Sequence, residues 1–190
     1  MANNALKTLK SIGKSFYTLP DLEKIFGLKR KSLLVALTRL EERGELERLA
    51  RGIYQLPATP VDVSAIATAL YQPSYVSFEW ALGRYGILSQ IPYTVTLATP
   101  RRPRKIIIGG IPCEYRRLKG SLFWGYSLAE DGYLAEPEKA LLDQLYLVSK
   151  GKAFIDMKAL DLKAVNKRVL QRYARKYPKA TCKLAQIALG

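Results

Sequence analysis

Residues with phosphate-binding chemistry gather between positions 29 and 51 of this 190-residue chain. Lysine and arginine neutralise backbone phosphates, while hydroxyl and small apolar side chains contact base edges in the major groove of DNA. Lys31, Val35 and Thr38 are the candidates for contacts with bases, and the others are candidates for contacts with phosphates. The full set of candidate DNA-binding residues is Lys29, Arg30, Lys31, Ser32, Val35, Thr38, Arg39, Arg48 and Arg51.

Two expected helices would position these residues. One begins at Thr18, where Asp21 follows three residues later at capping-box spacing. The next runs from about residue 29 to residue 43, and its cationic N-terminal end lies where free N–H groups and the helix dipole favour phosphate. Its apolar face, which is expected to be buried, holds Leu33, Ala36, Leu37 and Leu40. Its opposite face holds Lys31, Val35, Thr38 and Glu42. The alternative is an ordinary amphipathic helix with scattered cations.

A β-hairpin is expected directly after this helix. Residues 45–49 and 53–56 alternate in character and are joined across a turn in which Gly52 can adopt a positive φ. Arg48 and Arg51 are expected at the hairpin tip, within reach of a phosphate or the minor groove. Helix, turn, helix and arginine-tipped hairpin in this order predict a winged helix-turn-helix, which inserts one helix into the major groove of double-stranded DNA.

The rest of the chain predicts a second domain. Pro57 and Pro60 favour an extended connection. The expected division is a winged helix-turn-helix domain at residues 1–56, a linker at residues 57–63 and a C-terminal domain at residues 64–190. The fold class is therefore α/β (α+β), and the second domain is expected to be mixed, with antiparallel strands and a helical C-terminal end.

Individual elements of the second domain follow from local patterns. Strands are expected at residues 93–98, 105–108, 111–118 and 122–128, with a Gly109-Gly110 turn between the second and the third. Pro137 is expected to open a strong helix over residues 138–149. Residues 156–187 are expected to be helical, with a break near Tyr177-Pro178.

Charge is concentrated at the two ends of the sequence. The whole chain has a net charge of +15. Residues 1–56 hold 11 basic and 6 acidic residues, residues 57–150 hold 10 and 8, and residues 151–190 hold 10 and 2. Two basic ends around a near-neutral middle suggest two surfaces that face polyanions. The alternative for the C-terminal end is a solvated helix face.

Several classes of protein are disfavoured by composition. The chain has no histidine, which removes Ser-His and Cys-His nucleophile pairs and imidazole metal ligands. Cys113 and Cys182 lack metal-site spacing and are expected to be reduced thiols. No catalytic, metal-binding or cofactor-binding residue is predicted. No apolar run reaches the roughly 18 residues of a membrane span, and the N-terminus lacks an apolar signal segment, so a cytoplasmic protein without a membrane partner is expected.

A further basic group lies in the expected second domain. Its densest part is the run from Arg101 to Lys105, a loop beside a strand, and the following strand adds three cations. The group could extend a DNA footprint or bind an acidic protein, and a solvated loop is the alternative. Its members are Arg101, Arg102, Arg104, Lys105, Arg116, Arg117 and Lys119.

Residues 136–139 raise the alternative of a nuclease-like site. Glu136, Glu138 and Lys139 are residue types that hold Mg²⁺ and assist phosphodiester cleavage, but no strand aspartate precedes them at the required spacing. Glu138 and Lys139 are instead expected to be exposed in the first turn of a helix. A Mg²⁺-dependent nucleic-acid enzyme therefore stays a minor alternative, and a non-enzymatic protein is predicted.

Several segments together resemble the AbiEi family of antitoxins. In the C-terminal domain these are PSYVSFEWAL at 73–82, YTVT at 93–96, FWGY at 123–126 and EPEKALLD at 136–143; in the hairpin they are RGELER at 43–48 and ARGIY at 50–54. The resemblance covers about residues 14–150, and the PEKALLD segment is its most specific part. Residues 151–190 match nothing recognisable. The family often has Ser or Thr where this chain has Glu136, which caps a helix less well.

Membership of that family would imply a type IV toxin–antitoxin system. The winged helix would bind inverted repeats upstream of its own operon and act as a transcriptional repressor, and the C-terminal domain would be associated with neutralising a nucleotidyltransferase-like toxin. The alternative is a protein-interaction module whose basic surface meets an acidic toxin, with DNA binding secondary. The operator sequence, the toxin and the oligomeric state are left open by the sequence.

Overall fold

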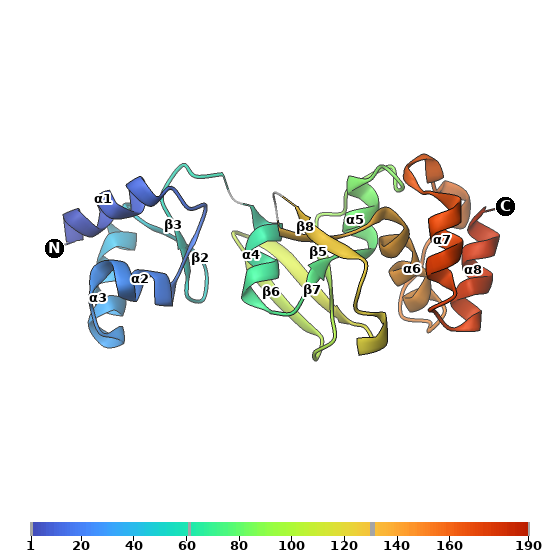
Figure 1. The fold of residues 1–190 in the computed structure, drawn as a ribbon. Coiled ribbons are helices and arrows are strands. Elements are labelled where there is room, and N and C mark those ends of the chain that lie inside the picture. The colour runs from blue at the N-terminus through green and yellow to red at the C-terminus, as the bar shows by residue number, and fades with distance from the viewer. Residues whose placement is uncertain (1, 61, 130–131, 190) are drawn as a thin grey trace. The chain divides into compact units, whose positions relative to one another are not determined.

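The computed structural model describes residues 2–60, 62–129 and 132–189 (Figure 1). The chain divides into two compact units. The N-terminal unit comprises residues 1–63 together with Ile107–Gly110, and the C-terminal unit comprises residues 64–106 and 111–190. Within the described residues there are eight α-helices and two sheets, so the expectation of a mixed α/β protein with a helical C-terminal end is confirmed.

The N-terminal unit is a winged helix-turn-helix. Its elements are α1 (Ala2–Ile12), β1 (Tyr17–Thr18), α2 (Leu19–Phe26), α3 (Arg30–Glu42), β2 (Glu47–Ala50) and β3 (Ile53–Gln55). The strands pair antiparallel in the order β1-β3-β2, and the hairpin of β2 and β3 forms the wing. The buried core draws one or more residues from each helix and from the sheet: Leu9, Tyr17, Leu22, Leu33, Leu37, Leu40, Leu46 and Tyr54.

Local sequence explains how α2 begins. Thr18 Oγ1 accepts a hydrogen bond from the backbone N–H of Asp21, and the Asp21 carboxylate accepts one from the backbone N–H of Thr18 at 2.9 Å. This reciprocal pair is the predicted capping box, and it satisfies two backbone donors that a helix start leaves open. Gly27 ends the helix in the left-handed conformation, with φ of +62°.

The C-terminal unit is built on a six-stranded sheet in the order β6-β7-β5-β4-β9-β8. The strands are β4 (Tyr75–Val76), β5 (Val95–Thr99), β6 (Arg104–Ile108), β7 (Ile111–Arg117), β8 (Tyr126–Ala129) and β9 (Gly132–Ala135). The helices are α4 (Val63–Leu70), α5 (Phe78–Arg84), α6 (Pro137–Val148), α7 (Lys167–Ala174) and α8 (Lys179–Leu189).

This sheet is mixed, and it contains parallel pairs beside the expected antiparallel ones. β4 with β5 and β8 with β9 are antiparallel, whereas β5 with β7 and β4 with β9 are parallel. The chain runs out along β6, turns at Gly109-Gly110 and returns as β7, which places β7 beside β5 in the same direction. Parallel pairs of this kind join segments separated along the chain, so local patterns could not predict them.

One expected strand begins later than predicted. The sequence predicts a single strand over residues 122–128, but Gly120–Leu122 forms a 3₁₀ turn and β8 begins only at Tyr126. Gly125, with φ of +71°, lies at the interruption. A positive φ is incompatible with continuous extended strand geometry, and it is open to glycine at little cost.

Helix α6 forms the centre of the C-terminal unit. Every residue from Glu138 to Leu147 is buried, and the helix contacts α5, α7 and α8. Figure 1 shows α7 and α8 beside α6 at the C-terminal end. The segment expected to be helical over 156–187 consists of two short 3₁₀ turns followed by α7 and α8, and the helices are separated at Tyr177-Pro178 as predicted.

Candidate nucleic-acid interface

Helix α3 separates a buried face from an exposed one. Leu33, Leu37 and Leu40 are buried in the core of the N-terminal unit. Lys31 and Thr38 are exposed on the other side. Val35 on that side is 54% exposed, although burying a valine side chain is favourable by about 1.5–3 kcal/mol. The face opposite the core is therefore accessible along the helix and is built of a cation, an apolar side chain and a hydroxyl.

The N-terminal end of α3 is cationic and lacks a side-chain cap. Lys29 occupies the N-cap position with extended backbone angles and forms no capping hydrogen bond through its side chain. Lys29, Arg30, Lys31 and Ser32 are all exposed, as is Arg39 further along the helix. Arg30 contacts Glu23 at 3.1 Å, but both side chains are solvent-accessible and such pairs are weak. This helix end combines N–H groups, the positive end of the dipole and exposed cations.

The wing places its two arginines at different positions. Arg51 lies in the turn between β2 and β3 and is exposed. Arg48 was expected at the tip as well, but it lies within β2 opposite Tyr54, next to a register shift between Arg48 and Ala50. The turn needs fewer residues than expected because β2 continues to Ala50. Both side chains are exposed, so two cations are available along the wing.

Gly52 joins the wing to the start of α2. The backbone N–H of Leu19 donates to the carbonyl oxygen of Gly52 at 3.1 Å. Gly52 has φ of +81°, and a Cβ there would lie 3.0 Å from Leu19 Cδ1. The positive φ of the wing turn therefore favours glycine, and any Cβ there would also require the Leu19 side chain to shift.

The second basic group lies in the C-terminal unit, and its members differ in environment. Arg101, Arg102 and Arg104 are exposed in and beside the loop before β6. The guanidinium groups of Arg101 and Arg104 lie 5.8 and 5.5 Å from the ring centroid of Tyr71, whose hydroxyl donates to the Arg102 carbonyl oxygen at 3.0 Å. Arg117 and Lys119 are exposed as well.

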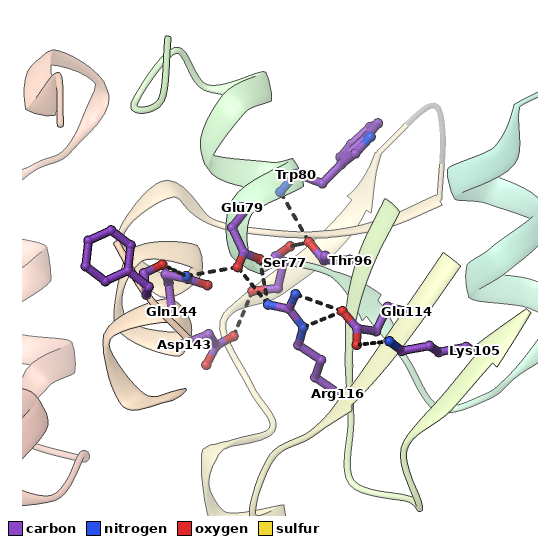
Figure 2. Close-up of polar contacts among 10 residues, drawn as sticks. Ser77, Glu79, Trp80, Thr96, Lys105, Glu114, Arg116, Asp143 and Gln144 are labelled. Atoms are coloured by element: carbon purple, nitrogen blue, oxygen red, sulfur yellow. Dashed lines mark hydrogen bonds and ion pairs between the residues drawn. The ribbon is translucent and has the colours of Figure 1, made fainter. Parts of the chain in front are cut away.

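Arg116 is held between two carboxylates (Figure 2). Its Nη1 lies 2.6 Å from an oxygen of Glu79, and its Nη2 lies 2.8 Å from an oxygen of Glu114. Lys105 contacts the other oxygen of Glu114 at 3.2 Å. Burial alone would lower the pKa of Arg116, but the hydrogen bonds to Glu79 and Glu114 raise that pKa overall. The charge of Arg116 is neutralised within the unit, and it contributes structure rather than an open cation.

A buried polar centre joins α6 to the sheet and to the C-terminal helices. The Lys139 ammonium pairs with Asp143 one turn along α6 and donates to the Tyr75 hydroxyl at 2.8 Å. Asp143 also accepts hydrogen bonds from Tyr75 at 2.9 Å, from Ser77 at 2.9 Å and from Tyr177 at 2.7 Å. Burial lowers the pKa of Lys139, although Asp143 opposes that effect. Burial and the Asp143 charge both raise the pKa of Tyr75 and Tyr177.

The expectation that Glu138 and Lys139 are exposed is wrong. Lys139 is 0% exposed and Glu138 is 7% exposed. Lys139 lies against the rings of Tyr75, Trp124 and Tyr177, and the start of α7 lies against Glu138. Glu138 accepts a hydrogen bond from the Asn166 N–H at 2.7 Å, and Glu136 accepts one from the Tyr173 hydroxyl at 2.7 Å. These carboxylates hold the C-terminal helices in place.

Sequence reasoning did not single out Asp143, Tyr75 or Tyr177. Lys139 and Asp143 are four residues apart, and that spacing could have predicted the ion pair. Nothing in the sequence pairs Asp143 with a tyrosine 34 or 68 residues away. In the described part of the chain, no group of three or more His, Cys, Asp or Glu side chains is placed to bind a metal ion. No helix among the described residues has the length and apolar character needed to cross a membrane.

Comparison with known proteins supports the identification of the N-terminal unit as the domain of a transcriptional regulator. Residues 5–57 match a family model described as "Transcriptional regulator, AbiEi antitoxin". No curated protein matches the chain. The matched segment begins within α1 and ends after β3, so it contains α2, α3 and the wing and leaves out the C-terminal unit. The winged helix-turn-helix of this chain is therefore similar to that of the AbiEi antitoxin transcriptional regulators, which supports the resemblance seen in the sequence.

Proposed function

We propose that this protein binds double-stranded operator DNA through its winged helix and thereby represses its own operon. The observation that supports this most strongly is the division of α3, whose outward face keeps Lys31, Val35 and Thr38 accessible while the inward face forms the core. Val35 and the flanking Leu34 are 54% and 42% exposed, so two apolar side chains are accessible on this side of the helix. An outward valine and hydroxyl suit contacts with thymine methyl groups and base edges.

The other candidate residues have a positioning role in this proposal. Lys29, Arg30, Ser32 and Arg39 would contact phosphates beside α3, and Arg48 and Arg51 would contact phosphates or the minor groove along the wing. The DNA-binding domain would comprise residues 1–56, followed by a linker at 57–63. A repressor of this kind would occupy inverted repeats, with two copies on one operator.

Two wing variants test the DNA-binding proposal. Arg48→Ala with Arg51→Ala removes two exposed cations, and the matched control Lys7→Ala with Lys10→Ala removes two exposed cations from α1. A labelled duplex taken from the region upstream of the gene is titrated at several salt concentrations. The wing variant should bind more weakly than the control, and its slope of log affinity against log salt should fall by about 0.9 for each phosphate that is no longer neutralised. Equal affinities and equal slopes would show that the wing has no role in binding DNA.

We also propose that the C-terminal unit, residues 64–190, neutralises a nucleotidyltransferase-like toxin. The motif segments that resemble the antitoxin family come together in this unit. Tyr126 stacks on Tyr75 with ring centroids 4.4 Å apart, and Lys139 lies 5.3 Å from the ring centroids of both Tyr75 and Trp124. The segments pack against one another, with Tyr75 and Lys139 buried and Trp124 and Tyr126 half-buried, and the surface around them would act on the toxin or on its products.

Co-expression tests this second proposal. The gene product encoded beside this chain is expressed alone, with the full chain, and with a chain that ends after the winged helix. Growth should be restored by the full chain and not by the winged helix alone. Restoration by the winged helix alone would assign neutralisation to repression or to the N-terminal unit, and no restoration by either chain would contradict the proposal.

A further inference from the structure

The last part of the chain carries cations without carboxylates. After Asp161 the sequence contains eight lysine or arginine residues and no aspartate or glutamate. Seven of the eight lie in or directly beside α7 and α8, and all seven are exposed: Lys167, Arg168, Arg172, Arg175, Lys176, Lys179 and Lys183. These exposed cations take part in neither the winged helix nor the buried centre on α6.

Helical geometry directs these cations outward. On α7, Arg168, Arg172 and the C-cap residue Arg175 are spaced by four and three residues, so they share one face. Leu170 and Ala174 are buried on the opposite face. On α8, Lys179 and Lys183 are one turn apart, whereas Thr181 and Ala185 are buried. We name the five outward cations Arg168, Arg172, Arg175, Lys179 and Lys183 the α7–α8 basic face.

Three carboxylates near these helices accept hydrogen bonds from their inward-facing groups. Tyr177, between the two helices, donates to Asp143 at 2.7 Å, Tyr173 donates to Glu136 at 2.7 Å, and Asn166 at the start of α7 donates its N–H to Glu138. The helices are thus fixed to α6 by carboxylates that point inward. Across the residues that the structure describes, no ion pair involves a cation of the α7–α8 basic face.

The character of this surface favours a nucleic acid over a protein partner. The centre of a protein–protein interface is depleted in charged residues and enriched in aromatic ones. Here Ile187 is the one large apolar side chain of α7 and α8 that is strongly exposed within the described residues. A groove of about 270 Å³ between the helices has a floor of small apolar side chains and leucines, while its polar lining residues are Gln171, Arg175 and Gln186. Uncompensated cations with glutamine donors between them suit a phosphate backbone.

We propose that the α7–α8 basic face is a second, sequence-independent phosphate-binding surface for double-stranded DNA. It would add affinity for DNA of any sequence, and the winged helix would supply the preference for the operator. The inference shares only its partner, duplex DNA, with the function proposed above. It accounts for the strong positive charge of residues 151–190, which the winged helix does not explain.

A random-sequence duplex of about three helical turns tests this surface, because no base is read there. The full chain with Arg168→Gln, Arg172→Gln and Arg175→Gln is compared with a matched control, Lys150→Gln, Lys152→Gln and Lys163→Gln. The control removes the same number of exposed cations from the segment before α7. The salt slope of the α7 variant should fall by roughly 2 to 3, at about 0.9 per phosphate contact, while the control keeps the slope of the unmodified protein.

Two outcomes would overturn the inference: a salt slope that is unchanged in the α7 variant, or an equal loss of slope in the α7 variant and its control. An unchanged slope together with loss of co-purification with the adjacent gene product would assign the face to an acidic protein. Failure of the proposed repressor function would give a different result: the unmodified protein would bind the upstream duplex no more tightly than the random duplex. The circular dichroism spectrum of each variant verifies that the helices are retained.

Discussion

Single residues fix the geometry of the wing. Gly52 adopts φ of +81°, and a Cβ at that position would lie 3.0 Å from Leu19 Cδ1. Gly110, in the β6–β7 turn, adopts the same φ of +81°, but a Cβ there would meet nothing within 4 Å. The two glycines therefore separate the cost of backbone strain from the cost of a close contact.

Gly52→Ala should destabilise the protein more than Gly110→Ala. Each substitution imposes a positive φ on alanine, at a cost of about 1 kcal/mol, and only Gly52→Ala also displaces Leu19. The measurement is the free energy of unfolding in urea for both variants. If Gly110→Ala proves the more costly, contact with α2 does not constrain the wing turn.

Tyr177 links stability to alkaline pH. Burial and the nearby Asp143 charge raise the pKa of Tyr177 in the folded protein, whereas in the unfolded chain it ionises near pH 10. Above that pH the folded state holds a proton that the unfolded state releases. The stability from this group is fully present below about pH 10 and is lost as pH rises, at up to about 1.4 kcal/mol per pH unit.

Tyr177→Phe removes this proton linkage. At pH 7 the variant should be less stable by about 1–2 kcal/mol, because Asp143 loses one of its donors. Above about pH 10 the difference between the unmodified protein and the variant should shrink, since only the unmodified protein loses the Tyr177 contribution. Urea unfolding at pH 7, 9 and about 11 measures both effects. A difference that stays constant with pH would contradict the assigned environment of Tyr177.

At the scale of elements, α3 and α6 show what local sequence can predict. The apolar spacing of α3 predicts its buried face, and the structure buries Leu33, Leu37 and Leu40 as expected. The capping box at Thr18 also follows from sequence, because its partners are three residues apart. Interactions within one or two helical turns are visible in a pattern of residue types.

Helix α6 is predictable in position but not in environment. Its start after Pro137 follows from sequence, but the burial of Glu138 and Lys139 depends on residues far along the chain, Asn166 for Glu138 and Tyr75 and Tyr177 for Lys139. Likewise, the parallel pairing of β5 with β7 depends on the route of the intervening hairpin. Local periodicity does not report contacts between distant segments. The buried centre on α6 could therefore be identified only from the structure.

The ion pair within α6 leads to a prediction at this scale. Asp143→Asn leaves the Lys139 ammonium without its charged partner in a site with 0% exposure, which should cost about 3–5 kcal/mol. Adding Lys139→Met removes the unpaired charge and should recover part of that loss. Free energies of unfolding for the two single variants and the double variant give the coupling energy. If the double variant loses as much as the sum of the single variants, the pair is not coupled.

At the scale of the whole molecule, the two units expose different kinds of side chains. The N-terminal unit exposes base-contacting residue types on α3 together with cations, while the C-terminal unit exposes cations on α7 and α8. Phosphate contacts supply affinity and base contacts supply specificity. Specificity for the operator should therefore depend on the outward face of α3 and not on the C-terminal helices.

The preference for operator DNA is the most direct test of α3 as the recognition helix. It is the ratio of affinities for the duplex upstream of the gene and for a random duplex at one salt concentration. For Lys31→Ala with Thr38→Ala this ratio should fall at least about tenfold, because each base contact contributes roughly 1–3 kcal/mol of discrimination. For the α7 variant the ratio should stay unchanged while both affinities decrease. If the α3 variant keeps the same ratio of affinities as the unmodified protein, α3 is not the helix that recognises the operator.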